Sequence, residues 1–379
     1  MTVRVGAFRT AAVAVALAMW TASCARERPA ETPAGQSFVV DSQPILSLEG
    51  TAADGTVLFG AVAGATRLPD GTLVIADRSG NALKLFDAEG RLTRTIGRPG
   101  QGPGEFSQVA AVRQCLGDSL FAWDYGVQEL EVFSSSGSFA RQVRLTEAPV
   151  LVACSRHGVL AFIKTPDQPQ PPQGAEVFRL SADLLLADAR GAGTHGLGSV
   201  SLAELTRSFL PRPGGLIARF AVGRERLYVC PTDSGTLGVY DIASGTPRSI
   251  PLAVNPRAPT RRQIEHAVED QLIYVPAGAL RDRFRERFLR VPPPESLQPC
   301  SNVLVDPDDN VWVVLSFPGD TVTTLRVFGP DDRMLGDVTV PEELNVLEIG
   351  SDYLLGSGET ADGEPWIRVY RVRRTAGRE

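Results

Sequence analysis

One pattern of turns and short alternating segments recurs along the chain, and it constrains the fold more than any other feature of the sequence. It is clearest over residues 68–97, which read LPDGTLVIADRSGNALKLFDAEGRLTRTIG. TLVIA and ALKLF alternate as strands do, and PDG and DAEG are typical of hairpin turns. Degraded copies follow at residues 117–145, 224–252 and 308–340. Such a period indicates a series of small antiparallel sheets and not two unrelated domains.

An aromatic residue on the third strand of each repeat counts the repeats. It occurs at six positions: Phe86, Phe133, Phe178, Tyr240, Phe328 and Tyr370. Three of the five intervals are 47, 45 and 42 residues, the size of a four-stranded propeller blade, and the other two contain insertions. The sequence therefore predicts an all-β fold over residues 37–379, a six-bladed β-propeller of four-stranded blades.

The chain ends too soon after Tyr370 for the sixth blade to supply its own fourth strand. An alternating segment, SFVVDSQPILSL at residues 37–48, precedes the first blade. We expect this N-terminal strand to pair into the last blade and to close the ring, because closure removes exposed sheet edges.

Two insertions interrupt the repeat. Residues 191–215 are expected to form a glycine-rich loop with a short helical turn. Residues 260–290, between blades 4 and 5, have a helical pattern that begins with a capping box of Thr260 and Gln263. The apolar residues of this insertion form two helix faces: Ile264, Val268 and Leu272, then Leu280, Phe284 and Phe288. The helices would either cover one mouth of the propeller as a lid or fill space at a blade edge.

Residues 1–23 have the layout of an export signal. Arg4 and Arg9 precede the apolar run AAVAVALAMW, and the small residues TAS precede Cys24. The apolar run is about half the length of a membrane-spanning helix. The pattern predicts a lipoprotein signal peptide, lipid attachment at Cys24 and a flexible, proline-rich tether over residues 24–36. An ordinary secretory signal cut near Ala22 is the alternative.

Residues 72–106 contain LVIAD, LKLFDAEG and GQGPGEF in that order, and this segment closely resembles an NHL-type repeat. The whole layout resembles the six-bladed propeller lipoproteins of bacterial envelopes, a group largely without assigned biochemistry. The resemblance implies a lipid-anchored protein of the cell envelope, on the periplasmic or the surface side of the outer membrane. Ala25 supports the outer membrane, because it is not the aspartate that is associated with inner-membrane retention.

The run TIGRPGQGPGEF at residues 95–106 raises two interpretations, a phosphate-binding loop and a corner between blades. It lacks the Gly-Lys-Ser/Thr of a P-loop, its prolines remove backbone donors, and a strand follows where a helix would be needed. Glycine allows positive φ and close backbone approach. We therefore expect a junction between blades 1 and 2, with Phe106 wedged between them.

Four cysteines follow Cys24, and an exported chain reaches an oxidising compartment in which disulfides form. Cys115 and Cys154 end the first strands of consecutive blades. Cys230 ends a second strand, and Cys300 begins the first strand of the next blade at the opposite face. Among the three pairings that four cysteines allow, this placement favours Cys115–Cys154 and Cys230–Cys300.

The turns that join second and third strands lie on the face where propeller ligands usually bind. They supply six ligand-face candidates: Asp77, Arg78, Asn81, Asp124, Tyr125 and Asp233. In NHL repeats the positions of Asp77 and Asn81 mainly cap the hairpin. Local turn bonding is therefore the alternative for these residues.

The chain carries a net charge of −6, which argues against nucleic-acid binding because phosphate neutralisation needs a basic surface. One basic patch interrupts this acidity: Arg281, Arg283, Arg285, Arg287 and Arg290. It would meet an anionic glycan, a headgroup or an acidic protein, or form only a solvated helix face.

The sequence predicts no cofactor. The three histidines, His157, His195 and His266, do not lie at strand beginnings, where channel-facing metal ligands would be expected. DPDDN at residues 306–310 is similar to the start of a calcium loop, but it aligns with a hairpin turn and lacks the following glutamate. A calcium site built from single acids of different blades would leave no motif and stays open.

These patterns favour a monomeric, lipid-anchored envelope propeller that binds a ligand, a protein or a glycan and catalyses nothing. The alternative is a metal-dependent propeller hydrolase or lyase, of the lactonase or amidating-lyase type. No serine elbow, pair of catalytic acids or Cys/His spacing favours that alternative. A stoichiometric divalent ion in the purified protein would favour it.

Overall fold

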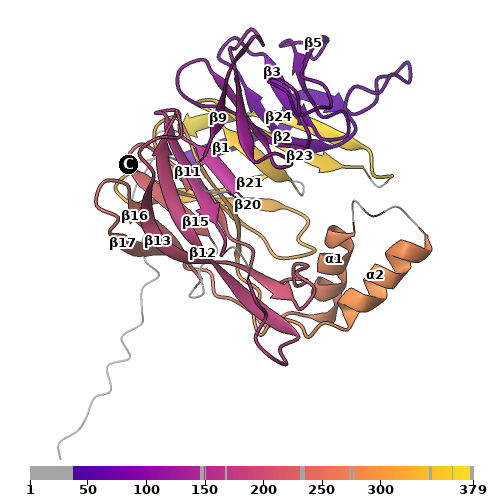
Figure 1. The fold of residues 1–379 in the computed structure, drawn as a ribbon, viewed down its shortest axis with the longest axis vertical. Coiled ribbons are helices and arrows are strands. Elements are labelled where there is room, and N and C mark those ends of the chain that lie inside the picture. Colours follow the sequence, from indigo (N-terminus) through magenta and orange to yellow (C-terminus); the bar gives the residue numbers. More distant parts are fainter. Residues whose placement is uncertain are drawn as a thin grey trace, which may run out of the picture. The chain divides into compact units, whose positions relative to one another are not determined.

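The computed structural model describes residues 37–145, 149, 151–166, 169–230, 235–272, 275, 278–340, 344–360 and 362–375. Within these ranges the chain forms six four-stranded antiparallel sheets and two short helices (Figure 1). The predicted six-bladed propeller is confirmed. The predicted signal peptide, Cys24 and the whole predicted tether lie outside the described residues, as does Asp233.

Each blade is a meander that runs from an innermost to an outermost strand. Blade 1 consists of β2 (Val62–Arg67), β3 (Leu73–Asp77), β4 (Ala82–Phe86) and β5 (Leu92–Ile96). Blade 2 consists of β6 (Val109–Gln114), β7 (Leu120–Asp124), β8 (Glu129–Phe133) and β9 (Phe139–Arg144). Blade 3 consists of β10 (Leu151–Cys154), β11 (Val159–Lys164), β12 (Val177–Asp188) and β13 (His195–Thr206).

The second half of the ring repeats this order. Blade 4 consists of β14 (Arg219–Val222), β15 (Arg226–Cys230), β16 (Thr236–Asp241) and β17 (Pro247–Pro251). Blade 5 consists of β18 (Cys300–Val305), β19 (Val311–Leu315), β20 (Thr323–Phe328) and β21 (Met334–Val340). Blade 6 consists of β22 (Asn345–Ile349), β23 (Tyr353–Glu359), β24 (Pro365–Thr375) and the N-terminal strand β1 (Ser37–Glu49).

Blade 6 closes the ring as predicted. Strand β1 pairs antiparallel with β24, from Phe38 opposite Arg374 to Glu49 opposite Trp366. Figure 1 shows the C-terminal strands β23 and β24 next to the first strands of the chain. The outer edge of the last blade is therefore built by the N-terminal end of the described chain, which joins the two ends of the sequence in one sheet.

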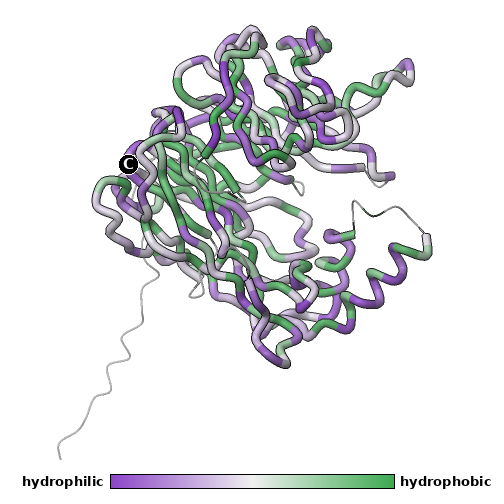
Figure 2. The backbone as a smooth tube through the Cα atoms, viewed as in Figure 1, coloured by the Kyte–Doolittle hydropathy of each residue, from purple (hydrophilic) through white to green (hydrophobic). Residues whose placement is uncertain are grey.

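The hydrophobic core is divided among the blade interfaces. In the described part of the chain, six clusters of buried apolar side chains each join one blade to the next, including blade 6 to blade 1. Figure 2 shows hydrophobic residues along the strands and hydrophilic residues at many of the turns. The predicted third-strand aromatics Phe86, Phe133 and Phe328 are almost fully buried, because both faces of a blade are covered by its neighbours.

The glycine run at residues 95–106 is the predicted junction between blades 1 and 2. Gly97 and Gly104 adopt φ of 78° and 75°, and a Cβ atom on Gly97 would lie 2.5 Å from the ring of Phe106. Phe106 is fully buried, and its ring centroid lies 6.0 Å from that of Phe133. The glycines thus serve a tight chain crossing.

Both predicted disulfides are present. Cys115–Cys154 joins blades 2 and 3, and Cys230–Cys300 joins blades 4 and 5. Each bridge connects two neighbouring blades next to an innermost strand. The bridges therefore restrain the wall of the central channel directly.

The insertion between blades 4 and 5 forms α1 (Arg261–Gln271) and α2 (Ala279–Leu289), which lie side by side in Figure 1. The predicted capping box of Thr260 and Gln263 is present. Val268 and Phe288 are buried between the helices, but Leu280 in the first turn of α2 is 59% exposed and lies outside that cluster. No described helix has the length and apolar character needed to cross a membrane.

The prediction for residues 191–215 is wrong. About half of this segment, His195–Thr206, is β13, the outermost strand of blade 3, which pairs with β12 from Val177 opposite Thr206 to Leu186 opposite His195. Two register shifts interrupt the pairing, and they break the regular alternation that would identify a strand in the sequence.

Candidate functional site

Two cavities lie along the central channel, whose wall is formed by the innermost strands. The upper chamber has a volume of about 370 Å³ and lies where β14, β18 and β22 begin. The lower chamber has a volume of about 390 Å³ and lies where β6, β10, β18 and β22 end. Both volumes are within the range of small-molecule sites. Arg219 and Asn302 line both chambers, so the chambers meet at these two residues.

The chambers are defined by the residues that line them. The upper chamber is lined by residues 214–217, 219, 270, 297, 298, 300–302, 314, 316–318, 320, 322, 323 and 344–346. The lower chamber is lined by residues 111, 113, 114, 151–157, 219–223, 302–307, 309 and 347–349.

Glu348, on β22, is the centre of a hydrogen-bond network in the wall of the lower chamber. The hydroxyls of Thr66 and Tyr353 donate to its carboxylate, and Arg156 forms an ion pair with it at 3.7 Å. Burial raises the pKa of Tyr353, and the adjacent Glu348 carboxylate raises it further. The network joins blades 6, 1 and 3, and it occupies both carboxylate oxygens with partners from the chain itself.

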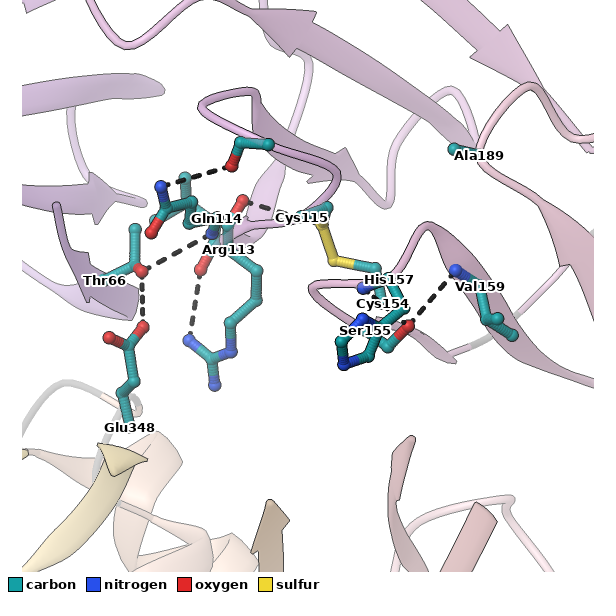
Figure 3. The surroundings of a disulfide bond; sticks show 12 residues. Thr66, Arg113, Gln114, Cys115, Cys154, Ser155, His157, Val159, Ala189 and Glu348 are labelled. Atoms are coloured by element: carbon teal, nitrogen blue, oxygen red, sulfur yellow. Dashed lines mark hydrogen bonds between the residues drawn. A yellow bond between two sulfur atoms is a disulfide. The ribbon is translucent and has the colours of Figure 1, made fainter. Parts of the chain in front are cut away.

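Arg113, near the end of β6, extends into the lower chamber beside this network. Its Nη1 donates to the carbonyl oxygens of Ala65 at 2.9 Å and of Val112 at 3.1 Å. Figure 3 shows Arg113 between Glu348 on one side and the turn of Ser155 and His157 on the other. Burial lowers the pKa of Arg113, an effect that Glu348 opposes. Arginine is not deprotonated in proteins, so Arg113 still contributes a positive charge to the chamber.

Arg219 begins β14 at the point where the two chambers meet. Its one hydrogen bond to a described residue runs from Nη1 to the carbonyl oxygen of the preceding Ala218, at 3.3 Å, and it forms no ion pair with any such residue. The side chain is exposed to the channel, and the loss of hydration there lowers its pKa. Most of the donors of this guanidinium therefore make no hydrogen bond to a described residue.

The other acids of the lower chamber belong to the turn after β18. Asp306 accepts hydrogen bonds from the backbone of Asp308 and Asn310 and from the indole of Trp312. Asp309 accepts a hydrogen bond from the backbone N–H of Arg224 at 3.0 Å. The segment DPDDN is thus a hairpin turn, as predicted, whose carboxylates hold the turn together.

The upper chamber has a different wall. Asp270, from the last turn of α1, lines it, so the helical insertion reaches this mouth of the channel. Asp320 also lines it and forms an ion pair with Arg257 at 3.7 Å. Burial raises the pKa of Asp270, although the nearby His266 opposes this effect. Asp270 and Asp320 therefore mark the upper mouth, whereas the lower chamber contains Arg113, which forms no ion pair with a described residue.

The predicted ligand-face residues that the structure describes lie in the turns of blades 1 and 2 and line neither chamber. Asp77 accepts hydrogen bonds from the backbone of Gly60, Ala61 and Ser79, and Asn81 accepts one from Val109 of the next blade. These hydrogen bonds join the start of a first strand to the turn between a second and a third strand.

Blade 2 repeats this arrangement at its own turn. The Asp124 carboxylate accepts hydrogen bonds from the backbone of Ser107, Gln108 and Gly126, while Tyr125 is 45% exposed and Arg78 of blade 1 is half-buried. The carboxylates of Asp77 and Asp124 thus accept equivalent backbone hydrogen bonds in consecutive blades. Local turn bonding, the alternative named for these positions, accounts for the contacts of both carboxylates.

The predicted basic patch on α2 is largely paired within the insertion. Arg281 and Arg285 both bind the carboxylate of Glu269 on α1, at 3.2 and 2.6 Å. Arg287 donates to the hydroxyl of Ser208, and Arg290 lies 3.7 Å from Glu286. These arginines therefore hold the insertion together.

Arg283 differs from the other four arginines of this patch. It is exposed, and it makes no hydrogen bond or ion pair with a described residue. Its guanidinium is therefore the least constrained of the patch.

The sequence reasoning missed Arg113, Arg156 and Arg219. The first and last of these belong to mainly apolar first strands: Arg113 lies in VAAVRQ, and Arg219 is the first residue of RFAV. A charged residue in the innermost strand of a blade points to the channel, because the blade faces are apolar. That exception to the apolar pattern was the signal that could have found them.

The placement of potential metal ligands bears on the metal-dependent alternative. Among the described residues, no group of three or more histidines, cysteines, aspartates and glutamates is placed to hold a metal ion. Of the three histidines only His157 lines a chamber, and His266 lies on α1. Contrary to the prediction, His195 does begin a strand, but this strand is β13, the outermost strand of blade 3.

Comparisons with known proteins agree with this fold. A family model described as a 6-bladed β-propeller matches residues 57–114, a minor part of the chain. No curated protein matches the chain.

Among solved structures, a DUF4221 family member from Bacteroides vulgatus is similar, with a TM-score of 0.53, 10% identity, and 90% of this chain and 99% of that chain covered. A candidate exported protein from Bacteroides fragilis gives a TM-score of 0.49 and 13% identity, over 89% of this chain and 95% of that chain. A streptogramin B lyase gives a TM-score of 0.40 and 10% identity, over 87% of this chain and 98% of that chain. At such identities a likeness shows the propeller fold alone.

Proposed function

We propose that this protein is a lipid-anchored binding protein of the cell envelope, with NHL-like blades, and that it takes up a small ligand in its central channel without transforming it. The observation that supports this best is the lower chamber, a cavity of about 390 Å³ lined by side chains of five blades. A site at the axis of a rigid ring is preorganised, because each wall strand is fixed by its own blade.

The location is proposed from the first part of the sequence and from the disulfides. Cys24 follows an export-like leader, and the propeller begins about a dozen residues later. Two bridges between blades are typical of a chain that matures in an oxidising compartment. We propose the outer membrane, with the propeller acting as a monomer.

Binding without catalysis is supported by the state of the polar groups in the lower chamber. Glu348, Asp306 and Asp309 are each held by hydrogen bonds within the chain, and general acids or bases need a free site facing the substrate. A propeller hydrolase or lyase would need a metal or an activated nucleophile at this position.

Retention of small molecules tests the proposal. The full-length protein, purified in detergent from membranes, would be incubated with an envelope metabolite extract, washed, and analysed by native mass spectrometry. Ala221→Trp fills the lower chamber from β14, and Val57→Trp, at an exposed position outside it, is the matched control. We expect a retained small molecule in the wild type and in Val57→Trp, and none in Ala221→Trp. Equal retention in all three proteins would overturn the proposal.

Two further measurements test its other parts. Metal analysis of the same sample should find no stoichiometric divalent ion, and finding one would favour the metal-dependent hydrolase or lyase. Metabolic labelling with a palmitate analogue should label the wild type and leave Cys24→Ser unlabelled. Absence of label in the wild type would refute the lipid anchor.

A further inference from the structure

We propose that the ligand of the lower chamber is an organic anion, whose carboxylate or phosphate group lies against Arg219 and Arg113. This inference rests on the proposed function and names the chemical class of the ligand. It is argued from the hydrogen bonds that these arginines make and leave unmade, from the pairing of the acids around them, and from the apolar part of the same wall.

Arg219 makes few contacts that stabilise the fold. A guanidinium carries five N–H donors, and this one uses one of its nitrogens on the carbonyl oxygen of the neighbouring Ala218. No described residue forms an ion pair with it, although it stands where hydration is reduced. Its exposed guanidinium lines both chambers, so its charge is available to an anionic ligand in the channel. A bound carboxylate or phosphate would accept two parallel hydrogen bonds from the free donors.

Arg113 adds a second positive charge to the same chamber. It donates to two backbone carbonyl oxygens and forms no ion pair with a described residue, so its charge is oriented by the wall and left uncompensated. The Glu348 carboxylate offsets part of the positive potential of Arg113 without an ion pair to it. This carboxylate already forms an ion pair with Arg156 and accepts hydrogen bonds from the hydroxyls of Thr66 and Tyr353. The orientation of Arg113 is fixed before a ligand arrives, which lowers the entropy lost on binding.

The three acids of the lower chamber do not cancel this field at its centre. Glu348 is paired with Arg156, Asp309 lies 3.7 Å from Arg224, and Asp306 lies 3.9 Å from Arg374. Each carboxylate thus has its own cation or donors at the wall. What remains unpaired is positive, and a narrow channel with apolar walls concentrates that potential.

The rest of the wall identifies the ligand as organic. Leu151 and Ala153 on β10, with Phe220 and Ala221 on β14, line the lower chamber and are only partly buried. Their free surface faces the same cavity as the two arginines. An inorganic ion would leave this surface wet, whereas an anionic group on an apolar body would cover it.

Four probes that share a benzene ring test the inference: benzoate, phenyl phosphate, benzylamine and benzyl alcohol. Each would be titrated by calorimetry into the full-length wild-type protein in detergent. We expect one of the two anions to bind most tightly, benzyl alcohol to bind at least tenfold more weakly, and benzylamine to show no binding. The better of benzoate and phenyl phosphate tells a carboxylate site from a phosphate site.

Variants separate binding from folding. Arg219→Gln and Arg113→Gln should each weaken the better anion at least tenfold, Arg219→Lys should weaken it less, and the exposed Arg283→Gln on α2 should leave it unchanged. Arg219→Gln should also leave the melting temperature of the free protein unchanged or raise it, because it removes an uncompensated cation. A lowered melting temperature together with unchanged anion affinity would make Arg219 structural and overturn the inference.

The failure of this inference is distinguishable from failure of the proposed function. If benzyl alcohol binds as tightly as the anions and Arg219→Gln changes neither, the chamber binds ligands but not as anions. If none of the probes binds, the anion site is refuted, and the retention experiment with Ala221→Trp decides separately whether the chamber binds anything.

Discussion

The two chambers of the channel have nearly the same volume and share the inner strands β14, β18 and β22, yet the charged side chains in their walls differ. The upper chamber, of about 370 Å³, has Asp270 and Asp320 at its mouth. The lower chamber, of about 390 Å³, has Arg113 in its wall, and no described residue forms an ion pair with this arginine. Arg219 stands between them. The difference arises from what surrounds each end of the strands.

The lower chamber is bounded by tight turns within blades, and these turns leave little freedom. The Ser155 hydroxyl accepts hydrogen bonds from the backbone of His157 and Val159, and Asp306 fixes the corresponding turn of blade 5. The upper chamber is bounded by connections between strands and by the insertion, which can vary without disturbing a blade. If the proposed ligand binds in this channel, its recognition depends on the rigid lower end, and its access depends on the more variable upper end.

Breaking the disulfides should have the largest effect, because each bridge restrains one chamber. The residues of the two bridges are separated by 39 and 70 positions, and the chain-entropy estimate for loops of these lengths is about 4 kcal/mol per bridge. We expect Cys115→Ser with Cys154→Ser, and Cys230→Ser with Cys300→Ser, to lower the free energy of unfolding by similar amounts. Urea unfolding of the two double variants measures this.

Ligand affinity should distinguish the same two variants. Cys154 lines the lower chamber next to Arg156, whereas Cys300 lines the upper chamber. Only the Cys115/Cys154 variant should therefore lose affinity for the anionic probe. Equal losses in both variants would show that the chambers do not act independently.

Glu348→Gln is expected to have the next largest effect and to change stability and affinity in opposite directions. The free energy of unfolding should fall by about 1–3 kcal/mol, because an amide cannot accept from both the Thr66 and Tyr353 hydroxyls as a carboxylate does. Affinity for the anionic probe should rise severalfold, because the substitution removes the negative charge that pairs with Arg156 and offsets the charge of Arg113. Unfolding and calorimetry on one sample give both values.

Asp309→Asn is the matched control for this change. Asp309 lines the same chamber, and its φ of 61° is one that asparagine tolerates. Its amide oxygen would still accept from the backbone of Arg224. Stability should change little, and affinity should rise less than in Glu348→Gln. An equal rise in both would mean that total charge, and not the position of Glu348, governs binding.

The sequence was sufficient for the architecture because the blades are defined by local signals. Turns such as PDG, strand alternation and a third-strand aromatic recur within a few residues of one another, and Phe86 and Phe133 occupy equivalent buried positions. Ring closure and the disulfides followed from the strand count, because the position of a residue within a blade fixes the face on which it lies. Only β13 was missed, where bulges interrupt the alternation.

The chambers could not be predicted in the same way. Arg113, Arg219 and Glu348 come from three different blades, and their proximity depends on how the ring closes. Their pairing depends on further residues that are hundreds of positions away, such as Thr66 for Glu348. The polar turn residues Asp77 and Asp124 were conspicuous for a local reason, since they hold their own turns.

The smallest effect is expected from Glu269→Gln, which tests the insertion beside the upper chamber. Hydrogen bonds from Arg285, and then from Arg281, hold the pKa of Glu269 below its usual value, although burial opposes this. A lowered pKa in the folded state means that this contribution to stability is present above the ordinary glutamate pKa of about 4.3 and is lost as the pH falls through the lowered value. Because the side chain is 44% exposed, solvent screening limits the effect at neutral pH to less than about 1 kcal/mol.

Urea unfolding of the wild type and Glu269→Gln over a range of pH measures this difference, which should disappear in acid. Glu265→Gln is the matched control, because Glu265 lies one turn earlier on α1 and its one ion pair with a described residue is with Arg261 of its own helix. Neither variant should change anion affinity in the lower chamber. A loss of affinity in Glu269→Gln alone would mean that the insertion acts on both chambers, and the contrast between a rigid recognition end and a variable access end would then fail.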